Sequence, residues 1–156
     1  MMTINKLRGV KNLDSDIRLN QLYNQFDVLL SELRNRRLPD SIIQTINSEV
    51  EEINTSNSLT TADLRKVIKK KQTAILKLIE NELKLVPKNY HRNLWLALGM
   101  TVFGIPLGVL AGVLLKKPGL FAIGLPIGVA IGVTVGTAMD KKAVEENRQL
   151  NIEIKY

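Results

Sequence analysis

Apolar residues recur at helical spacing through the first half of this chain. Between about residues 14 and 37 they are separated by alternating steps of three and four positions, which is a heptad pattern. The apolar positions of this pattern are Leu19, Leu22, Phe26, Leu29 and Leu33, with Ile17 and Leu30 beside them. Similar stripes predict a second helix over about 41–53 and a third from about 60 to 86. The three helices predict a small antiparallel bundle, although a heptad seam also suits pairing between two copies of the chain.

Polar residues mark the expected helix ends. Residues 14–16, with the sequence DSD, are candidate N-caps of the first helix. Thr60 with Asp63 three positions later resembles a capping box for the third helix, and Pro87 is expected to end it. Residues 69–71 are consecutive lysines, which spread over a helical turn, so we expect them to be solvated.

The second half of the chain has a different pattern. Two uncharged apolar runs, residues 94–115 and 120–139, are separated only by the tetrad KKPG. At a rise of about 1.5 Å per residue each run reaches roughly 30 Å, the hydrocarbon thickness of a bilayer. We therefore expect an all-α chain, with a cytosolic three-helix bundle over residues 1–90, a transmembrane helical hairpin over 91–139 and a cytosolic tail over 140–156. The last residues alternate like a short strand, and they either dock on the bundle or stay flexible.

Glycine recurs at every fourth position of both runs. These candidate helix-packing and oligomerisation positions are Gly104, Gly108, Gly112, Gly124, Gly128, Gly132 and Gly136. Glycine inside a helix costs up to about 1 kcal/mol relative to alanine, but in lipid small residues let two helix backbones approach closely. Folding the chain back at Pro118 would place Gly112 level with Gly124, and Gly104 with Gly132. The glycines then either close one hairpin or also pack neighbouring copies together.

The two runs are also internal repeats, since FGIPLGVLAG matches IGLPIGVAIG at an offset of 20 residues. Each repeat holds one proline, Pro106 or Pro126, which removes a backbone hydrogen bond and predicts a kink. Neither run contains an ionisable or amide side chain. A proton relay or a charged selectivity ring would need such groups, so a pore of these helices would select poorly.

Basic and aromatic residues flank the two runs. The candidate membrane-interface anchors are Lys88, Tyr90, His91, Arg92, Trp95, Lys116, Lys117, Lys141 and Lys142. More cations lie on the outer flanks than in the tip between the runs, which favours cytoplasmic N- and C-termini. The first sixteen residues lack an apolar h-region, so we expect no cleavable signal peptide. These features predict a protein of the bacterial inner membrane.

Composition changes this picture little. The mean hydropathy of +0.01 is an average over two unlike halves, and the net charge of +7 lies mostly in residues 1–93. We expect this charge to attract anionic lipid headgroups, and the scarcity of aromatic residues for base stacking does not favour nucleic acid. The chain has no cysteine, and it shows no metal-ligand cluster, phosphate loop or nucleophile with a base. We therefore predict no enzymatic activity, no catalytic residues, and no metal or other cofactor.

Residues 85–155 include the stretches LVPKNYHRNLWLALGMTVFGIPLGV and GLPIGVAIGVTVGTAMDKKAVEENRQL. Over these residues the chain resembles the glycine zipper family of small Bacteroidota proteins. The resemblance implies a two-span membrane hairpin and no established activity. The functional hypotheses are a self-associating membrane protein that forms a pore or permeabilises the membrane, and, as the alternative, a non-conducting anchor, scaffold or accessory subunit. In either case the bundle could bind a cytosolic protein partner, and we expect a homo-oligomer.

Overall fold

The computed structural model describes residues 2–9, 16–56, 59–117, 119 and 121–155. In this described part every regular element is a helix, as the hydrophobic patterns predict, and one isolated parallel bridge joins Val86 to Gln149. The chain forms two compact units. The first contains residues 2–85 and 150–154, and the second contains residues 86–149. The sequence-based boundaries at residues 90 and 140 lie inside the second unit, and residues 150–154 of the C-terminal tail belong to the first.

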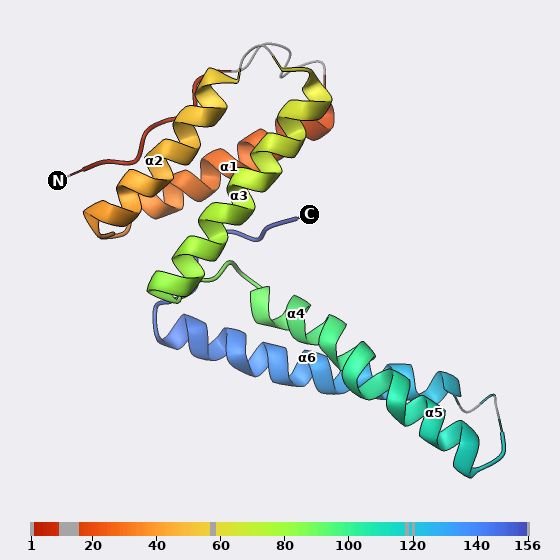
Figure 1. Cartoon of the computed structure of the whole chain (residues 1–156). Coiled ribbons are helices and arrows are strands. Elements are labelled where there is room, and N and C mark those ends of the chain that lie inside the picture. The colour runs from red at the N-terminus through yellow and green to blue at the C-terminus, as the bar shows by residue number, and fades with distance from the viewer. Residues whose placement is uncertain (1, 10–15, 57–58, 118, 120, 156) are drawn as a thin grey trace. The chain divides into compact units, whose positions relative to one another are not determined.

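The first unit holds three helices, α1 (Ile17–Arg34), α2 (Asp40–Thr55) and α3 (Thr61–Leu83) (Figure 1). The heptad positions of α1 are buried in the core of this unit, together with the apolar stripes of α2 and α3. The seam is therefore used for packing within the chain. Ile17 is an exception to the expected stripe, because it is 76% exposed at the first position of α1.

Local hydrogen bonds set the helix ends. The side chain of Asp16 caps α1 by accepting from the N–H groups of Arg18 and Leu19, both at 3.0 Å. The other two candidate caps, Asp14 and Ser15, lie outside the described residues. At α3 the Thr60 hydroxyl accepts from the Asp63 N–H at 3.2 Å, so the capping interaction predicted for this helix is confirmed.

Helix α3 ends earlier than expected. Lys84 takes a left-handed conformation with φ of 56°, and the next N–H, of Leu85, donates to the carbonyl of Ile79 at 3.1 Å. This hydrogen bond, with that from the Lys84 N–H to the carbonyl of Glu80, gives partners to carbonyls of the last turn, so the helix closes without proline. The helix therefore stops at Leu83, and Pro87 lies beyond it.

One of the three consecutive lysines is not solvated as expected. The Lys71 side chain is only 14% exposed, and its ammonium forms ion pairs with Glu49, at 2.8 Å, and with Glu52. The hydrogen bonds to these two carboxylates raise the pKa of Lys71 above its ordinary value. Because both acids lie on α2, this lysine links α2 to α3.

Both terminal segments complete the core of the first unit. Residues 2–9 run in an extended conformation along α2, and Ile4 is only 5% exposed. At the other end of the chain the alternating pattern docks on the bundle: Leu150, Ile152 and Ile154 are buried, and the residues between them are exposed. The N–H of Asn151 donates to the Glu32 carboxylate of α1 at 3.2 Å.

The second unit is a helical hairpin. Its first arm consists of α4 (Tyr90–Leu98), a π-helical segment η2 (Gly99–Gly104) and α5 (Ile105–Leu114). Its second arm is the single helix α6 (Phe121–Glu145), which runs back beside the first arm (Figure 1). Both arms extend beyond the apolar runs at the open end of the hairpin.

Candidate functional site

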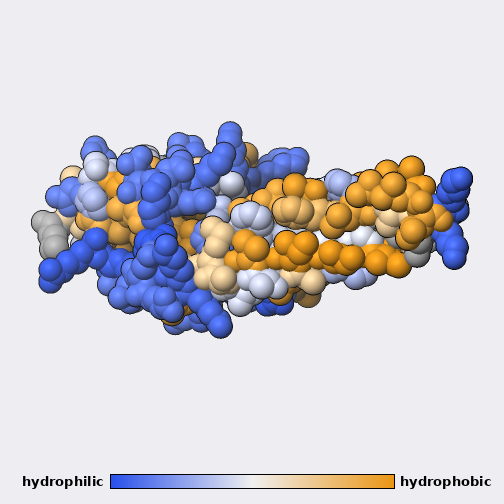
Figure 2. Space-filling model, turned by 90° about the horizontal axis from the view of Figure 1, so that it is seen from below, coloured by the Kyte–Doolittle hydropathy of each residue, from blue (hydrophilic) through white to orange (hydrophobic). Residues whose placement is uncertain are grey.

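The hairpin presents an apolar surface along most of its length. Its arms, Tyr90–Leu114 and Ala122–Glu145, are long and apolar enough to cross a membrane, and only 17% and 22% of their most apolar windows are buried. A helix in the core of a soluble protein would be mostly buried. Figure 2 shows that the hydrophobic surface gathers over this hairpin, whereas the three-helix unit is mainly hydrophilic. Such a contiguous apolar surface indicates a membrane or a protein partner.

Glycines allow the two arms to touch through their backbones. A Cβ atom placed on Gly128 would lie 2.7 Å from the Cα of Gly104, and one on Gly124 would lie 2.6 Å from the Cα of Gly108. Real side chains do not fit at these distances, so alanine in either place would force the helices apart. These four predicted glycines are buried inside the hairpin.

The remaining predicted glycines of α6 meet the start of the first arm. A Cβ on Gly132 would clash with the backbone of Trp95, and one on Gly136 would lie 2.5 Å from the Cα of Arg92. Gly112, near the tip, is half-buried. All the glycines of α6 therefore face α4, η2 and α5 within the same hairpin.

The register of the hairpin differs from the expected one by about one turn. Gly104 pairs with Gly128 instead of Gly132, and Gly108 pairs with Gly124. The centre of the fold-back is thus near Lys116, which takes a left-handed conformation with φ of 50° and closes α5. The expected pivot, Pro118, lies outside the described residues. Helix-capping geometry, which the spacing of glycines does not reveal, sets where the chain reverses.

Gly99 is an interface glycine that the four-residue pattern misses. A Cβ on Gly99 would lie 2.9 Å from the Cα of Gly132, so this residue also lies between the arms. Gly99 precedes Gly104 by five positions, and in an α-helix five positions turn it about 140° away. The π-helical η2 spans these five positions, with the Ile105 N–H donating to the carbonyl of Met100, and its wider turn brings both glycines to one face.

The two predicted kink prolines occupy different settings. Pro106 stands at the second position of α5, directly after η2. Proline cannot donate to the carbonyl four positions earlier, and π-helical turns often accompany such interruptions of the hydrogen-bond ladder. Pro126 stands inside α6, which continues as one helix from Phe121 to Glu145. The two sequence repeats therefore have different backbone conformations around their prolines.

An acidic residue of α6 caps the first arm. The carboxylate of Asp140 accepts from the N–H groups of His91 and Arg92, both at 3.0 Å, and is only 7% exposed. The residue at the N-cap position of α4, Asn89, has a φ of 58° and makes no side-chain cap. Asp140 therefore satisfies N–H groups that the start of a helix leaves without partners. Sequence reasoning missed this residue, although it is the one acid that directly follows the second apolar run.

The residues predicted to be membrane-interface anchors lie at the two ends of the hairpin. Because His91 and Arg92 bond to Asp140, the start of the first arm and the end of α6 share one end. The rings of Tyr90 and His91 pack edge to face there, 5.2 Å apart, and Trp95 is half-buried one turn further on. Four exposed cationic side chains also lie at this end: Lys88, Arg92, Lys141 and Lys142. The exposed Lys116 and Lys117 lie at the tip.

Polar side chains of the arms bond to their own helices. The hydroxyl of Thr101 donates to the carbonyl of Ala97 at 3.0 Å, and that of Thr134 donates to the carbonyl of Ala130 at 2.8 Å. Both hydroxyls thus have an acceptor that needs neither water nor a second protein. Two helical threonines therefore add little polarity to the outer surface of the hairpin.

Helix α6 carries a second stripe of small residues on its outer side. Two positions from the buried glycines, and so about 200° around the helix, lie exposed small side chains. They are Ala122, Ala130, Thr134 and Ala138. Within the described residues no group of three or more His, Asp or Glu side chains is placed to hold a metal ion.

Known proteins supply no further guide to this chain. Neither protein-family models, nor curated proteins, nor solved structures give a match to it. Its function is therefore inferred from its own residues.

Proposed function

We propose that this chain is an integral membrane anchor that presents its three-helix unit to a protein partner in the bacterial cytoplasm. The observation that carries the proposal is the exposed apolar surface of the hairpin. The buried glycines do not contribute to this surface, because they pack between the two arms. At about 1.5 Å per residue, arms of 25 and 24 residues reach roughly 36 Å, enough to cross a bilayer with its interfaces.

The distribution of charge supports cytoplasmic termini. The exposed cations Lys88, Arg92, Lys141 and Lys142 lie at the open end of the hairpin, and Lys116 and Lys117 lie at the tip. The excess of cations at the open end favours that end as the cytoplasmic one. There these side chains would meet anionic lipid headgroups.

A non-conducting role suits this hairpin better than a pore. The glycines meet the opposite arm, and the hydroxyls of Thr101 and Thr134 donate to their own helices. A pore would then be lined by aliphatic side chains. Such a hydrophobic constriction excludes water and therefore blocks the passage of ions.

Self-association with pore formation is the second candidate, and one observation favours it. The exposed stripe of Ala130, Thr134 and Ala138 lies on the outer side of α6, where a second hairpin could approach closely. In this arrangement the inner glycines close each hairpin and the outer stripe joins the copies. The resemblance to the glycine zipper family stays a prediction, as does the absence of enzymatic activity.

The first experiment places the chain relative to the membrane. Because the chain has no cysteine, Lys117→Cys at the tip and Lys88→Cys at the open end each introduce a single thiol. We expect both variants to stay in the membrane after carbonate extraction, and an impermeant maleimide added to intact spheroplasts to label only Lys117→Cys. Extraction of the protein by carbonate would overturn the membrane proposal, and labelling of Lys88→Cys alone would reverse the topology.

A second experiment separates the anchor from the pore. We would measure the mass of the protein in nanodiscs and ion flux through liposomes for the natural chain, Ala130→Leu and Gly128→Leu. An anchor gives no flux from well-inserted protein. Flux that Ala130→Leu abolishes, together with a lower mass, would instead establish a pore assembled through the outer stripe.

A further inference from the structure

The N-terminal segment of residues 2–9 is held mainly by its main chain. The Asn47 side chain of α2 accepts from the N–H of Asn5 at 2.7 Å and donates to the carbonyl of Thr3 at 3.0 Å. One amide group thus bonds to the backbone on both sides of Ile4. These bonds depend on backbone groups that every residue except proline carries.

The same arrangement repeats two helical turns further along α2. The Asn54 side chain accepts from the N–H of Arg8 at 2.8 Å and donates to the carbonyl of Lys6 at 3.3 Å, on both sides of Leu7. At the other end of the segment the Met2 N–H donates to Asp40 at 3.3 Å. Every third residue of the segment therefore bonds to every seventh residue of the helix.

Elementary geometry explains this spacing. Seven residues of an α-helix rise about 10.5 Å, and three residues of an extended chain span about 10 Å. The repeats of the two backbones therefore coincide along the whole of α2. Asp40, Asn47 and Asn54 form an acceptor ladder that an extended chain matches without adjustment.

Only two side chains of the segment are enclosed. Ile4 is buried and Leu7 packs against the core of the first unit, whereas Thr3, Asn5, Lys6 and Arg8 are exposed. The two enclosed side chains are thus aliphatic and three positions apart, and the side chains between them are exposed.

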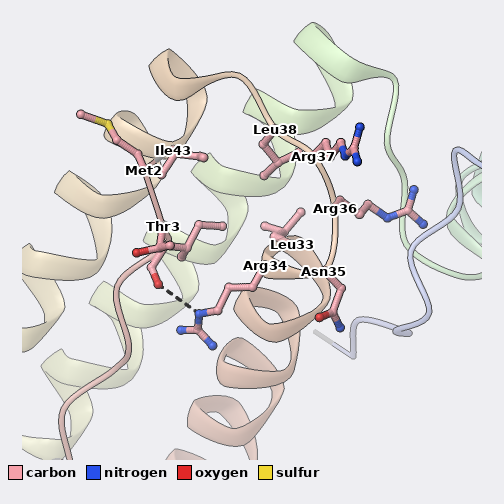
Figure 3. A pocket seen from close by; sticks show the side chains of 10 residues that line it. Met2, Thr3, Leu33, Arg34, Asn35, Arg36, Arg37, Leu38 and Ile43 are labelled. Atoms are coloured by element: carbon pink, nitrogen blue, oxygen red, sulfur yellow. Dashed lines mark hydrogen bonds between the residues drawn. The ribbon is translucent and has the colours of Figure 1, made fainter.

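Residues of α1 also bond to the segment, so residues 2–9 lie in a groove between α1 and α2. The Arg34 guanidinium donates to the carbonyls of Ile4, at 3.1 Å, and Asn5, at 2.8 Å, and Figure 3 shows its side chain reaching toward the segment. The Tyr23 hydroxyl donates to the carbonyl of Arg8 at 2.7 Å. A pocket of about 290 Å³ opens beside residues 2–4 and continues to the α1–α2 turn, so the groove is not completely filled there.

We propose that the groove between α1 and α2 is a binding site for an extended polypeptide, which it recognises through the main chain and two aliphatic side chains at positions i and i+3. Residues 2–9 are its resident ligand, and a partner segment of the same chemistry competes with them. This proposal concerns the first unit only and is independent of membrane insertion.

The covalent link favours the resident segment over any competitor. A short connection gives a tethered ligand an effective concentration in the millimolar range. A free peptide of similar affinity, present at a lower concentration, therefore does not displace it. Cleavage of the link removes this advantage. A protease site placed within residues 10–15 of the full chain therefore converts the segment into an ordinary ligand.

The test measures exchange in the cleaved full-length protein. The probe is a fluorescent, N-acetylated peptide of residues 2–9, and its anisotropy reports binding in detergent solution. We expect saturable binding that the unlabelled peptide reverses. Asn47→Ala with Asn54→Ala removes four hydrogen bonds, so it should weaken binding at least tenfold. The exposed Asn81→Ala on α3 is the matched control and should leave the affinity unchanged.

Two altered peptides test how the segment is recognised. A peptide with Ile4→Asp should fail to bind, because Ile4 is buried, and one with Lys6→Ala should bind as the natural peptide does. Circular dichroism of the cleaved protein checks that the helices remain folded. The proposal is overturned if the cleaved segment never exchanges in a hundredfold excess of peptide, if it leaves and no peptide rebinds, or if the double asparagine variant binds normally. If cleavage unfolds the helices, the segment is a permanent part of the core, and the proposal is also overturned.

Discussion

Asp140 and His91 are 49 positions apart in the chain, yet a carboxylate oxygen of Asp140 accepts the backbone N–H of His91 at 3.0 Å. The second carboxylate oxygen accepts the N–H of Arg92 at the same distance. The end of the second arm thus caps the start of the first. These two hydrogen bonds help to close the open end of the hairpin, together with the bond from the Val86 N–H to the carbonyl of Arg148, and glycine contacts close the remaining length.

Asp140→Asn should therefore weaken the hairpin. The amide of asparagine has one oxygen, so it can accept from only one of the two N–H groups. Its NH₂ group would face the other N–H group, which now donates to the second carboxylate oxygen of Asp140. We expect a loss of about 1–3 kcal/mol in the unfolding free energy of the hairpin, with faster hydrogen exchange at His91 and Arg92. The exposed Glu145→Gln on the same helix is the control. Unchanged exchange rates in Asp140→Asn would refute the capping role.

Gly128→Ala should separate the two arms. Its Cβ would lie 2.7 Å from the Cα of Gly104, so the helices must move apart at a cost of about 1–3 kcal/mol. Steric-trapping measurements of hairpin unfolding would detect this loss. Ala130→Leu, on the exposed side of the same helix, should leave hairpin stability nearly unchanged. If the two substitutions cost the same, the arms do not depend on close backbone approach.

The start of α3 should contribute a pH-dependent stability. Hydrogen bonds from Thr60 and then Lys66, with the charge of Lys66, lower the pKa of the exposed Asp63 below its ordinary value. A carboxyl group whose pKa is lower in the folded state stabilises the fold at pH values above its unfolded-state pKa. This stabilisation is lost as the pH falls through the folded-state pKa. The natural chain should thus unfold at higher urea concentration than Asp63→Asn at pH 7. The difference should shrink at pH 2 to 3, and a gap that is equal at both values would contradict the assignment.

Leu150→Ala should destabilise the three-helix unit, although Leu150 follows the hairpin in sequence. Leu150 is fully buried in the core of that unit, and truncation of a buried leucine typically costs about 2–5 kcal/mol. Urea unfolding followed by circular dichroism would measure the loss. The exposed Glu153→Ala, on the alternate face of the same segment, is the control and should stay within about 0.5 kcal/mol of the natural chain. Equal stabilities of the two variants would show that the tail is not part of the core.

Tertiary contacts account for the features that sequence reasoning missed or misplaced. Lys71 belongs to a run of three lysines, and only the position of α2 makes it a half-buried ion-pair partner. Gly99 falls outside the four-residue spacing, and only the π-helical turn brings it into the glycine interface. Asn47 and Asn54 have the seven-residue spacing in the sequence, but nothing local indicates that an extended segment lies along them.

The sequence by itself determined the helices, the approximate limits of the two apolar arms, the cap at Thr60 and the short stretch, residues 14–16, that holds the cap of α1. These features depend on periodicity and on side chains within a few positions of one another, so local patterns are sufficient to predict them. The tertiary structure decided the register of the glycines, the cap from Asp140, the docking of residues 150–154 and the groove that holds residues 2–9. Each of these joins groups that are distant in the chain, and the geometry of a distant contact depends on how all the intervening elements turn and pack.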